Sequence, residues 1–359
     1  MTKPVILVVG ARPNFMKIAP LHAELVRRGE AVLLLHTGQH YDDNMSKVFF
    51  DDLGMPKPDI YLGIGSGSHA TQTAKVMIEF EQICLDRTPS MVVVVGDVNS
   101  TVACSIVCAK LLVPCAHVEA GLRSFNDEMP EELNRIQTDK LSHILFTPSA
   151  AADKNILNEG FLSPYQSVVN VGDTMFDAVK MFSPFARHSE LMGRLELFMK
   201  PFVLATIHRR ENVNHPERLK ERIDALNELH ENGISVWMPL HPSTKIEVER
   251  IGLEIKFITS PPVGYLEMLW AIQHSSIVIT DGGGLQKEAY FLGKHCITLR
   301  NETEWVELID INANFLHPLG DKELLSEKVN RIIKQSLPSD KPYGKGDAAE
   351  KIARTILAN

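Results

Sequence analysis

Three carboxylates in the first half of the chain stand where a strand ends or a helix begins. Asp97 comes directly after the run "MVVVVG", Glu119 follows "CAHV", and Glu131 lies at the start of the helix expected after Pro130. Carboxylates that converge can divide general acid and general base work, because repulsion and burial push their pKa values apart. The alternative role, as N-caps or helix-start charges, suits Glu132 well and Asp97 poorly. We therefore expect Asp97, Glu119 and Glu131 to be catalytic.

A glycine turn in the second half could bind a phosphate. The segment "TDGGGLQKEA", residues 280–289, places Gly282, Gly283 and Gly284 between an expected strand and a helix. Backbone amides at a helix start, with the positive end of the helix dipole, suit a phosphate or diphosphate. The alternative is a tight turn without a ligand. The first turn of the chain reads "GARPNFMK" and lacks the GxGxxG fingerprint, which argues against NAD.

Other basic and titratable residues also follow expected strands directly. Arg12 and Lys17 come after the first strand, where they could hold a diphosphate or simply be solvated. His208 and Arg209, in "IHRRE", and His241, in "PLHPST", follow strands of the second half. A histidine flanked by cations and an acidic residue can act as a proton donor, although a lone histidine is more often structural. We expect His208 to be functional and leave His241 open.

Length and composition restrict the class of protein. The 359 residues exceed what one core usually fills, and no apolar run is long enough to cross a bilayer. The formal net charge is -8 and the basic residues are dispersed, so a nucleic-acid surface is not expected. The five cysteines form no CxxC pair, which predicts neither a disulfide framework nor a metal site. The N-terminus reads as a first strand without a signal-peptide cleavage site, which predicts a cytoplasmic protein.

Short β-branched runs alternate with amphipathic stretches along the chain. This alternation predicts the α/β class, with two Rossmann-like doubly wound domains. We expect an N-terminal domain at 1–175 that carries the carboxylates, a C-terminal domain at 176–340, and a last helix at 341–359 that packs back on the first domain. Ligands of open parallel sheets bind beyond the carboxyl ends of the strands, so the polar residues named above should face a cleft.

Eight motifs occur in order across nearly the whole chain: "GARPNFMK", "HTGQH", "GDVNST", "HVEAGLRS", "MPEELNR", "IHRRE", "TDGGGLQKEA" and "PYGKGDA". Together they closely resemble the non-hydrolysing UDP-N-acetylglucosamine 2-epimerases, which share the two-domain architecture of GT-B glycosyltransferases. The resemblance implies inversion at C2 of a UDP-2-acetamido sugar for surface polysaccharide biosynthesis. It implies elimination and re-addition of UDP, with no cofactor and no metal ion. It further implies a cytoplasmic homodimer.

The resemblance also implies roles for single residues. Asp97, Glu119 and Glu131 match the acid/base carboxylates of the family. The other matched positions are Arg12, Lys17, Arg135 and His208 at the diphosphate, with His208 also counted as catalytic, and Glu288 at the ribose. Arg209, His241 and the three glycines complete the expected binding site for UDP. Which carboxylate is the acid and which is the base stays open.

Three departures from the family pattern stand out. Gly282 replaces a usual serine, so a hydroxyl that would meet phosphate is missing, and Asn14 replaces a usual glutamate. The segment "QHYDDNM" breaks the spacing found in bacterial members regulated by a second UDP-N-acetylglucosamine, which leaves allosteric regulation open.

The substrate is open between two sugars. The segments "LQKEAYFLGK" and "LRNETEWVEL" look more like the subgroup that acts on UDP-2,3-diacetamido-2,3-dideoxyglucuronate, whereas UDP-N-acetylglucosamine is the common substrate of the family. A GT-B glycosyltransferase using a UDP sugar and a catalytically silent UDP-sugar sensor are the alternatives. Neither needs Asp97, Glu119 and Glu131 together.

Overall fold

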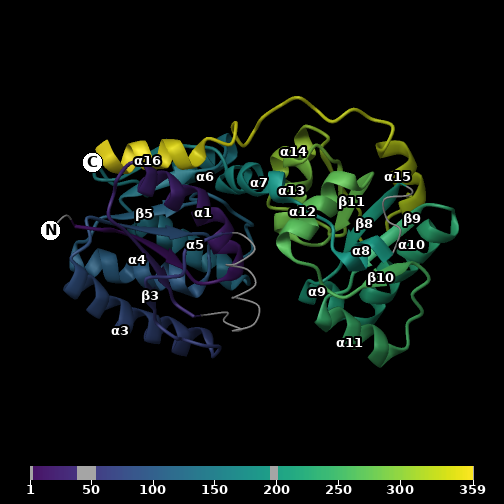
Figure 1. Ribbon diagram of the computed structural model, residues 1–359, viewed down its shortest axis with the longest axis horizontal. Coiled ribbons are helices and arrows are strands. Elements are labelled where there is room, and N and C mark those ends of the chain that lie inside the picture. The colour runs from purple at the N-terminus through teal and green to yellow at the C-terminus, as the bar shows by residue number, and fades with distance from the viewer. Residues whose placement is uncertain (1–2, 39–53, 195–200, 359) are drawn as a thin grey trace. The chain divides into compact units, whose positions relative to one another are not determined.

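The structure is a computed structural model that describes residues 3–38, 54–194 and 201–358. The chain divides into two compact units. Unit 1 holds Met1–Met181 and Lys341–Asn359, and unit 2 holds Phe182–Asp340. Each unit contains one parallel sheet with helices between its strands (Figure 1), which confirms the predicted α/β class.

The sheet of unit 1 has seven parallel strands. They are β1 (Val5–Val9), β2 (Val32–His36), β3 (Ile60–Tyr61), β4 (Met91–Val95), β5 (Cys115–Val118), β6 (Ile144–Thr147) and β7 (Ser167–Asn170). Their order across the sheet is β3-β2-β1-β4-β5-β6-β7. Every residue of β1, β4 and β5 is buried, as expected for strands that helices cover on both faces.

The helices of unit 1 flank this sheet. They are α1 (Arg12–Arg27), α3 (His69–Arg87), α4 (Asn99–Leu111), α5 (Pro130–Leu141), α6 (Ala150–Glu159), α7 (Thr174–Phe182) and α16 (Ala348–Ala358). Helices α1 and α16 pack together, and α3 packs on α4 at the opposite side of the sheet (Figure 1). Strands β1, β4 and β5 are neighbours in this order, so the loops that follow these three strands lie side by side.

The first turn of the last helix, α16, is hydrogen-bonded to α7 of unit 1. The carboxylate of Asp177 on α7 accepts the backbone N–H groups of Ala348 and Ala349 at 3.1 and 2.9 Å. Ile352 and Ile356 of α16 are buried. The C-terminal segment is therefore an integral part of the first unit.

The sheet of unit 2 has six parallel strands. They are β8 (Phe202–Thr206), β9 (Ser235–Pro239), β10 (Ile258–Ser260), β11 (Ile277–Thr280), β12 (Cys296–Thr298) and β13 (Asn314–Leu316). Their order is β10-β9-β8-β11-β12-β13. Along β8, Val203 and Ala205 belong to one hydrophobic cluster while Phe202 and Leu204 belong to another. Both faces of this sheet are thus covered, because successive side chains of a strand point to opposite faces.

The helices of unit 2 include the elements that carry its candidate site. They are a 3-10 turn (Ser183–Phe185), α8 (Glu190–Arg194), α9 (Arg210–Val213), α10 (Pro216–Glu231), α11 (Pro242–Ile251), α12 (Tyr265–His274), α13 (Gly283–Phe291), α14 (Val306–Asp310) and α15 (Leu325–Ile332). The helices α9, α11 and α13 begin just after β8, β9 and β11. Their first turns therefore lie at the carboxyl edge of the sheet, where ligands of such folds bind.

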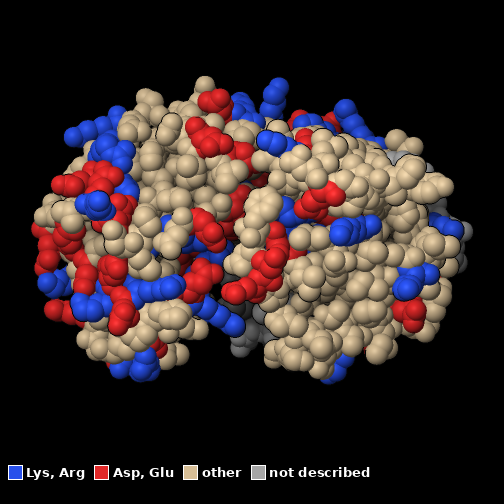
Figure 2. All heavy atoms as spheres, turned by 180° about the vertical axis from the view of Figure 1, so that it is seen from behind, with Lys and Arg blue, Asp and Glu red and all other residues tan. Residues whose placement is uncertain are grey.

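Lys and Arg side chains lie among Asp and Glu side chains in Figure 2, most densely toward the left of the view. On the helices of unit 2, ion pairs one helical turn apart include Lys220 with Asp224 and Arg250 with Glu247. Within the described part of the chain, no helix has the length and apolarity to cross a membrane. The five cysteines are buried and free of disulfides.

Candidate active site

Two of the predicted carboxylates stand at the ends of neighbouring strands. Asp97 is separated from β4 only by Gly96, and Glu119 follows β5 directly, with β4 and β5 paired in parallel register. Glu119 has a φ of 70°, in the left-handed region that non-glycine residues seldom adopt. A residue held there usually serves a function or is fixed by its surroundings. The sheet therefore brings Asp97 and Glu119 to one edge of unit 1.

Glu119 forms an ion pair with Lys17 of α1. The Lys17 ammonium donates to Glu119 Oε2, and the side chains are 16% and 4% exposed. Gly96 lies beside this pair, since an added Cβ there would be 3.6 Å from Glu119 Oε2 and 3.8 Å from Lys17 Nζ. The carboxylate, the ammonium and the Gly96 turn thus form one compact group. The side chain of Arg12 and residues 39–53, with the "QHYDDNM" segment, lie outside the described residues.

Asn14, which replaces a usual glutamate, holds the first turn to the adjacent strand. Its Oδ1 accepts the N–H groups of Gly10 and Ala11 at 3.3 and 2.9 Å, and its Nδ2 donates to the Val95 carbonyl at 3.3 Å. An amide can donate and accept in this way, whereas a carboxylate only accepts. The departure at this position therefore fits its surroundings.

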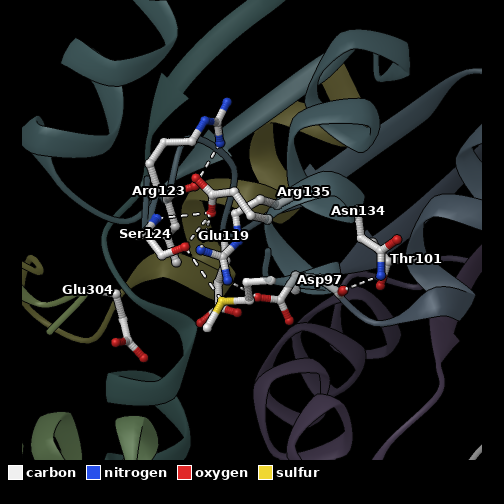
Figure 3. Close-up of polar contacts among 12 residues, drawn as sticks. Asp97, Thr101, Glu119, Arg123, Ser124, Asn134, Arg135 and Glu304 are labelled. Atoms are coloured by element: carbon white, nitrogen blue, oxygen red, sulfur yellow. Dashed lines mark hydrogen bonds and ion pairs between the residues drawn. The ribbon is translucent and has the colours of Figure 1, made fainter. Parts of the chain in front are cut away.

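Asp97 is paired with a buried arginine. Arg135 of α5 donates Nη2 to Asp97 Oδ2 and Nη1 to Glu132 Oε2, the latter at 2.9 Å. Asn134 donates to the Asp97 carbonyl at 2.8 Å (Figure 3). Helix α5 thus fixes both the backbone and the side chain of Asp97. Arg135, expected at a diphosphate, is bound here by two carboxylates.

Glu132 is more than the helix-start charge that the sequence suggested. It is 2% exposed and accepts the Ser124 N–H at 3.0 Å, the Ser124 hydroxyl at 2.9 Å and the Phe125 N–H at 3.0 Å, besides Arg135. It therefore joins the loop after β5 to the helix that holds Asp97.

Glu131 differs from the other two predicted carboxylates. It lies in the first turn of α5 and is exposed. Among the described residues, the structure records no hydrogen bond or ion pair from its side chain. The structure thus brings Asp97 and Glu119 into ion pairs with Arg135 and Lys17, and leaves Glu131 at the surface of the same unit.

In unit 2, a fully buried carboxylate organises the segment that carries His208. Asp281 follows β11 and accepts the N–H groups of His208 and Arg209 and the Asn212 side-chain amide, each at 3.0 Å. The His208 ring is 45% exposed on its side-chain atoms, and its Nδ1 lies 3.4 Å from Asp281 Oδ1. Asp281 thus holds the backbone that carries the His208 ring, and the ring itself stays accessible.

The predicted glycine turn begins α13, with Gly282 as its N-cap residue. A Cβ added to Gly282 would be 2.6 Å from His208 Cε1, and one added to Gly283 would be 2.6 Å from Glu304 Oε1. Real Cβ atoms do not approach this closely, so the neighbours would have to move. A serine at position 282 would therefore require the exposed ring of His208 to shift.

Glu304 binds two arginines next to the glycine turn. It pairs with Arg300 at 2.8 Å and with Arg209 at 3.3 Å. Burial alone would raise the pKa of Glu304, but the two guanidinium groups outweigh it and hold the pKa below its usual value. Trp305, the next residue, donates its ring N–H to the Gly283 carbonyl at 2.9 Å, and Lys287 lies 3.8 Å above its ring. Arg209 is thus held near the turn.

The two remaining predicted residues of unit 2 have different surroundings. His241 is the N-cap of α11 and accepts the Ser243 N–H at 3.3 Å. Partial burial, followed by the neighbouring His208, lowers its pKa. Glu288 is buried on α13 near Tyr265. Burial, followed by the Glu288 charge, raises the Tyr265 pKa far above its usual value.

The acidic residues Glu132, Asp139, Asp281 and Glu304 were given no site role from the sequence. One had a usable signal, because Glu132 and Arg135 stand three residues apart, on one helix face. For the others the partners are distant along the chain, as between Asp281 and His208. No group of described residues could hold a metal ion.

A family model described as UDP-N-acetylglucosamine 2-epimerase matches residues 23–357. The chain is 43% identical to the UDP-2,3-diacetamido-2,3-dideoxy-D-glucuronate 2-epimerase of Pseudomonas aeruginosa over 98% of this chain and 99% of that protein. It is 38% identical to the UDP-N-acetylglucosamine 2-epimerase of Methanocaldococcus jannaschii over 98% of both chains.

Solved structures give the same result. The Methanocaldococcus jannaschii UDP-GlcNAc 2-epimerase in complex with UDP-GlcNAc and UDP matches with a TM-score of 0.88 at 36% identity, over 99% of this chain and 100% of that chain. The Neisseria meningitidis enzyme bound to UDP-GlcNAc matches with a TM-score of 0.87 at 28% identity, with the same coverage. The GT-B-like fold predicted from the resemblance is confirmed. The chain belongs to the UDP-N-acetylglucosamine 2-epimerase family.

Proposed function

We propose that this protein inverts C2 of a UDP-2-acetamido sugar by eliminating UDP and adding it back. The observation that carries the proposal is the pairing of Glu119 with Lys17 and of Asp97 with Arg135 at the ends of adjacent strands. Each carboxylate lies next to a cation, which suits proton transfer near a departing diphosphate. Family membership supplies the reaction class, and these pairs supply the chemistry.

The reaction needs an elimination because the C2 proton is not next to a carbonyl group. As a base takes this proton, the C1–O bond to UDP breaks, which gives UDP and a 2-acetamidoglucal. The diphosphate then returns to C1 while C2 receives a proton on its other face. We assign the proton transfers to Asp97, Glu119 and Glu131, with His208 as a further proton donor. Which carboxylate acts first is left to experiment.

The diphosphate requires cations and N–H donors. We assign this task to the amides of Gly282, Gly283 and Gly284, with Arg209 beside them. The first turn of α13 and its dipole favour an anion there. Arg12, Lys17, Arg135 and His241 are assigned supporting places at the nucleotide, and Glu288 is assigned to the ribose.

The sugar itself is proposed at the level of the class. The relatives include an enzyme for a diacetamido-glucuronate and enzymes for UDP-N-acetylglucosamine, at comparable identities. The C5 carboxylate of a glucuronate would need cationic or multiple donors in a dry site. Arg209 and Arg300 are the candidates in unit 2, and in the structure both are paired with Glu304.

Proton NMR in deuterium oxide tests the function directly. An epimerase exchanges the C2 proton of its substrate with solvent and needs no acceptor, whereas a glycosyltransferase needs one and a sensor does neither. Both nucleotide sugars are offered at equal concentration. A tenfold preference in kcat/KM, about 1.4 kcal/mol of transition-state binding, identifies the substrate. Exchange with neither sugar contradicts the proposal.

The setting of the reaction is also proposed from the resemblance. We assign the enzyme to the cytoplasm, as a homodimer that supplies sugars for surface polysaccharide. Sedimentation equilibrium measures the dimer, and cell fractionation measures the location. A monomer at micromolar concentration would contradict the assignment as a homodimer.

A further inference from the structure

A buried histidine links the turns that carry the two paired carboxylates. His117 lies in β5 with no exposed surface. Its Nδ1 is 2.7 Å from Asp139 Oδ1, and its Nε2 is 2.9 Å from the Gly96 carbonyl oxygen. Asp139 belongs to α5, and Gly96 precedes Asp97. The ring therefore lies between the helix behind the site and the turn in front of it.

Both neighbours of the ring are acceptors. A backbone carbonyl can only accept, and an ionised carboxylate can only accept. A neutral imidazole has one N–H and one lone pair, so one of its nitrogens would face an oxygen lone pair. In a site without exposed surface such a contact is costly. The geometry is satisfied when His117 carries two protons and donates both.

The remaining contacts of Asp139 place the extra proton on the ring. Asp139 Oδ2 lies 2.8 Å from Arg123 Nη1 and accepts the Gly121 N–H at 3.1 Å. A guanidinium and an N–H donor on one oxygen favour the ionised carboxylate. Arg123 is held in turn by Glu159 of α6, at 2.5 and 3.0 Å. With a charged ring, the set of His117, Arg123, Asp139 and Glu159 contains two cations and two anions and is neutral as a whole, with Glu159 at its exposed end.

The charged groups around the ring come from several elements. Asp139 of α5 contacts the ring, Arg123 of the loop after β5 pairs with Asp139, and Glu159 of α6 pairs with Arg123. Beyond Gly96 lies the pair of Lys17 and Glu119.

This network fixes the backbone on both sides of the reacting groups. His117 holds the carbonyl before Asp97, and Asp139 holds the N–H two residues after Glu119. Gly121 has a φ of 77°, and a Cβ there would be 2.4 Å from the Ala152 carbonyl oxygen, so this turn is tightly confined. The left-handed backbone of Glu119 lies between these anchors.

We propose that His117 and Asp139 form a charged pair that positions Asp97 and Glu119 for proton transfer. The proposal rests on the proposed function for its effect on catalysis, but the charge of the ring does not depend on it. His117 and Asp139 are positioning residues, because they act through the two turns and not on the substrate. A site misaligned by about 1 Å can lose about 10²-fold in rate.

The first test measures the charge by nitrogen-15 NMR of the full-length protein labelled in its histidine rings. The signals of His117 are assigned by their loss in His117→Gln. We expect both ring nitrogens to carry protons at neutral pH, and a single neutral tautomer in Asp139→Asn. A neutral His117 in the wild type overturns the charged pair whether or not the protein is an epimerase.

The second test separates positioning from folding. In Asp139→Asn we expect kcat for C2 epimerisation to fall about 10²-fold, with KM changed less than threefold and the circular dichroism spectrum retained. The matched control is Asp86→Asn, which makes the same chemical change at an exposed position of α3 in the same unit and leaves the network intact. We expect its kcat to stay within twofold of wild type.

A fallback keeps this test decisive if Asp139→Asn does not fold. His117→Gln can still donate to the Gly96 carbonyl but cannot carry the charge. We expect a folded protein with the same loss in kcat. Wild-type kcat in either folded variant overturns the positioning role. A wild-type protein without epimerase activity would refute the proposed function and leave the NMR result to decide the charge of His117.

Discussion

The role of Glu132 in joining the loop after β5 to α5 can be tested by Glu132→Gln. In the structure its Oε2 accepts from the Ser124 N–H, the Ser124 hydroxyl and Arg135, while Oε1 accepts from the Phe125 N–H. A glutamine has the same shape but only one acceptor oxygen. With that oxygen at the Oε2 place, the amide NH2 faces the Phe125 N–H, and two donors then meet.

The magnitude follows from these contacts. A partly buried N–H left without an acceptor costs about 1–2 kcal/mol, and the change of the Arg135 contact from charged to neutral costs about 1 kcal/mol more. The free energy of unfolding should therefore fall by about 2–3 kcal/mol. At roughly 2–4 °C per kcal/mol for domains of this size, Tm should fall by roughly 4–12 °C.

Differential scanning calorimetry measures this change against a matched control on the same loop. Glu128 is exposed, and its recorded contact is from its own backbone N–H to Asn126 at 3.1 Å. Glu128→Gln removes the same charge and should change the free energy of unfolding by less than about 0.5 kcal/mol. If the Tm values of the two variants differ by less than about 2 °C, Glu132 does not clamp the loop and the reasoning fails.

Four further outcomes are expected. Asp97→Asn and Glu119→Gln should each lower kcat by roughly 10²-fold or more while UDP affinity by calorimetry stays similar, and a variant with normal turnover would remove that residue from the mechanism. Gly121→Ala, whose Cβ would lie 2.4 Å from a backbone oxygen, should lower the free energy of unfolding in urea by about 2–4 kcal/mol, against about 1 kcal/mol for Gly160→Ala, where nothing lies within 4 Å. Burial lowers the pKa of His36 to about 4, so the unfolded state binds more protons than the folded state below pH 6.5. The free energy of unfolding should therefore fall by about 3 kcal/mol between pH 6.5 and pH 4, and this pH dependence should be absent in His36→Gln. Turnover should be the same with EDTA or with added NAD, and a loss that a divalent ion restores would contradict the metal-free mechanism.

The fold class was predictable because each central strand is an uninterrupted apolar run. The segment "VVVV" before Gly96 is apolar at every position, so a strand formed there must be buried on both faces of its sheet. This alone places Asp97 at the carboxyl edge of a sheet. The same reasoning places Glu119 and His208. Their positions needed only the strand that precedes them and no knowledge of distant contacts.

The partners of these residues were not predictable on the same ground. Lys17 meets Glu119 across 102 positions, and Arg209 meets Glu304 across 95. Which distant side chains meet depends on loop paths that no local pattern encodes. Asp281 and Glu132 lie at helix starts, where exposed acidic residues are common. Their burial becomes visible only when the segments that donate to them are in place.

The fastening of α16 to unit 1 has a consequence for biosynthesis. A ribosome releases the residues of α16 only after it has made all of Phe182–Asp340. At 5–20 residues per second this delay is roughly 10–35 s. During that time unit 2 can fold as a block, while the α1 surface that α16 will cover is open and Asp177 lacks its two N–H donors. The nascent first unit therefore stays incomplete until Lys341–Asn359, which are made after unit 2, have been added.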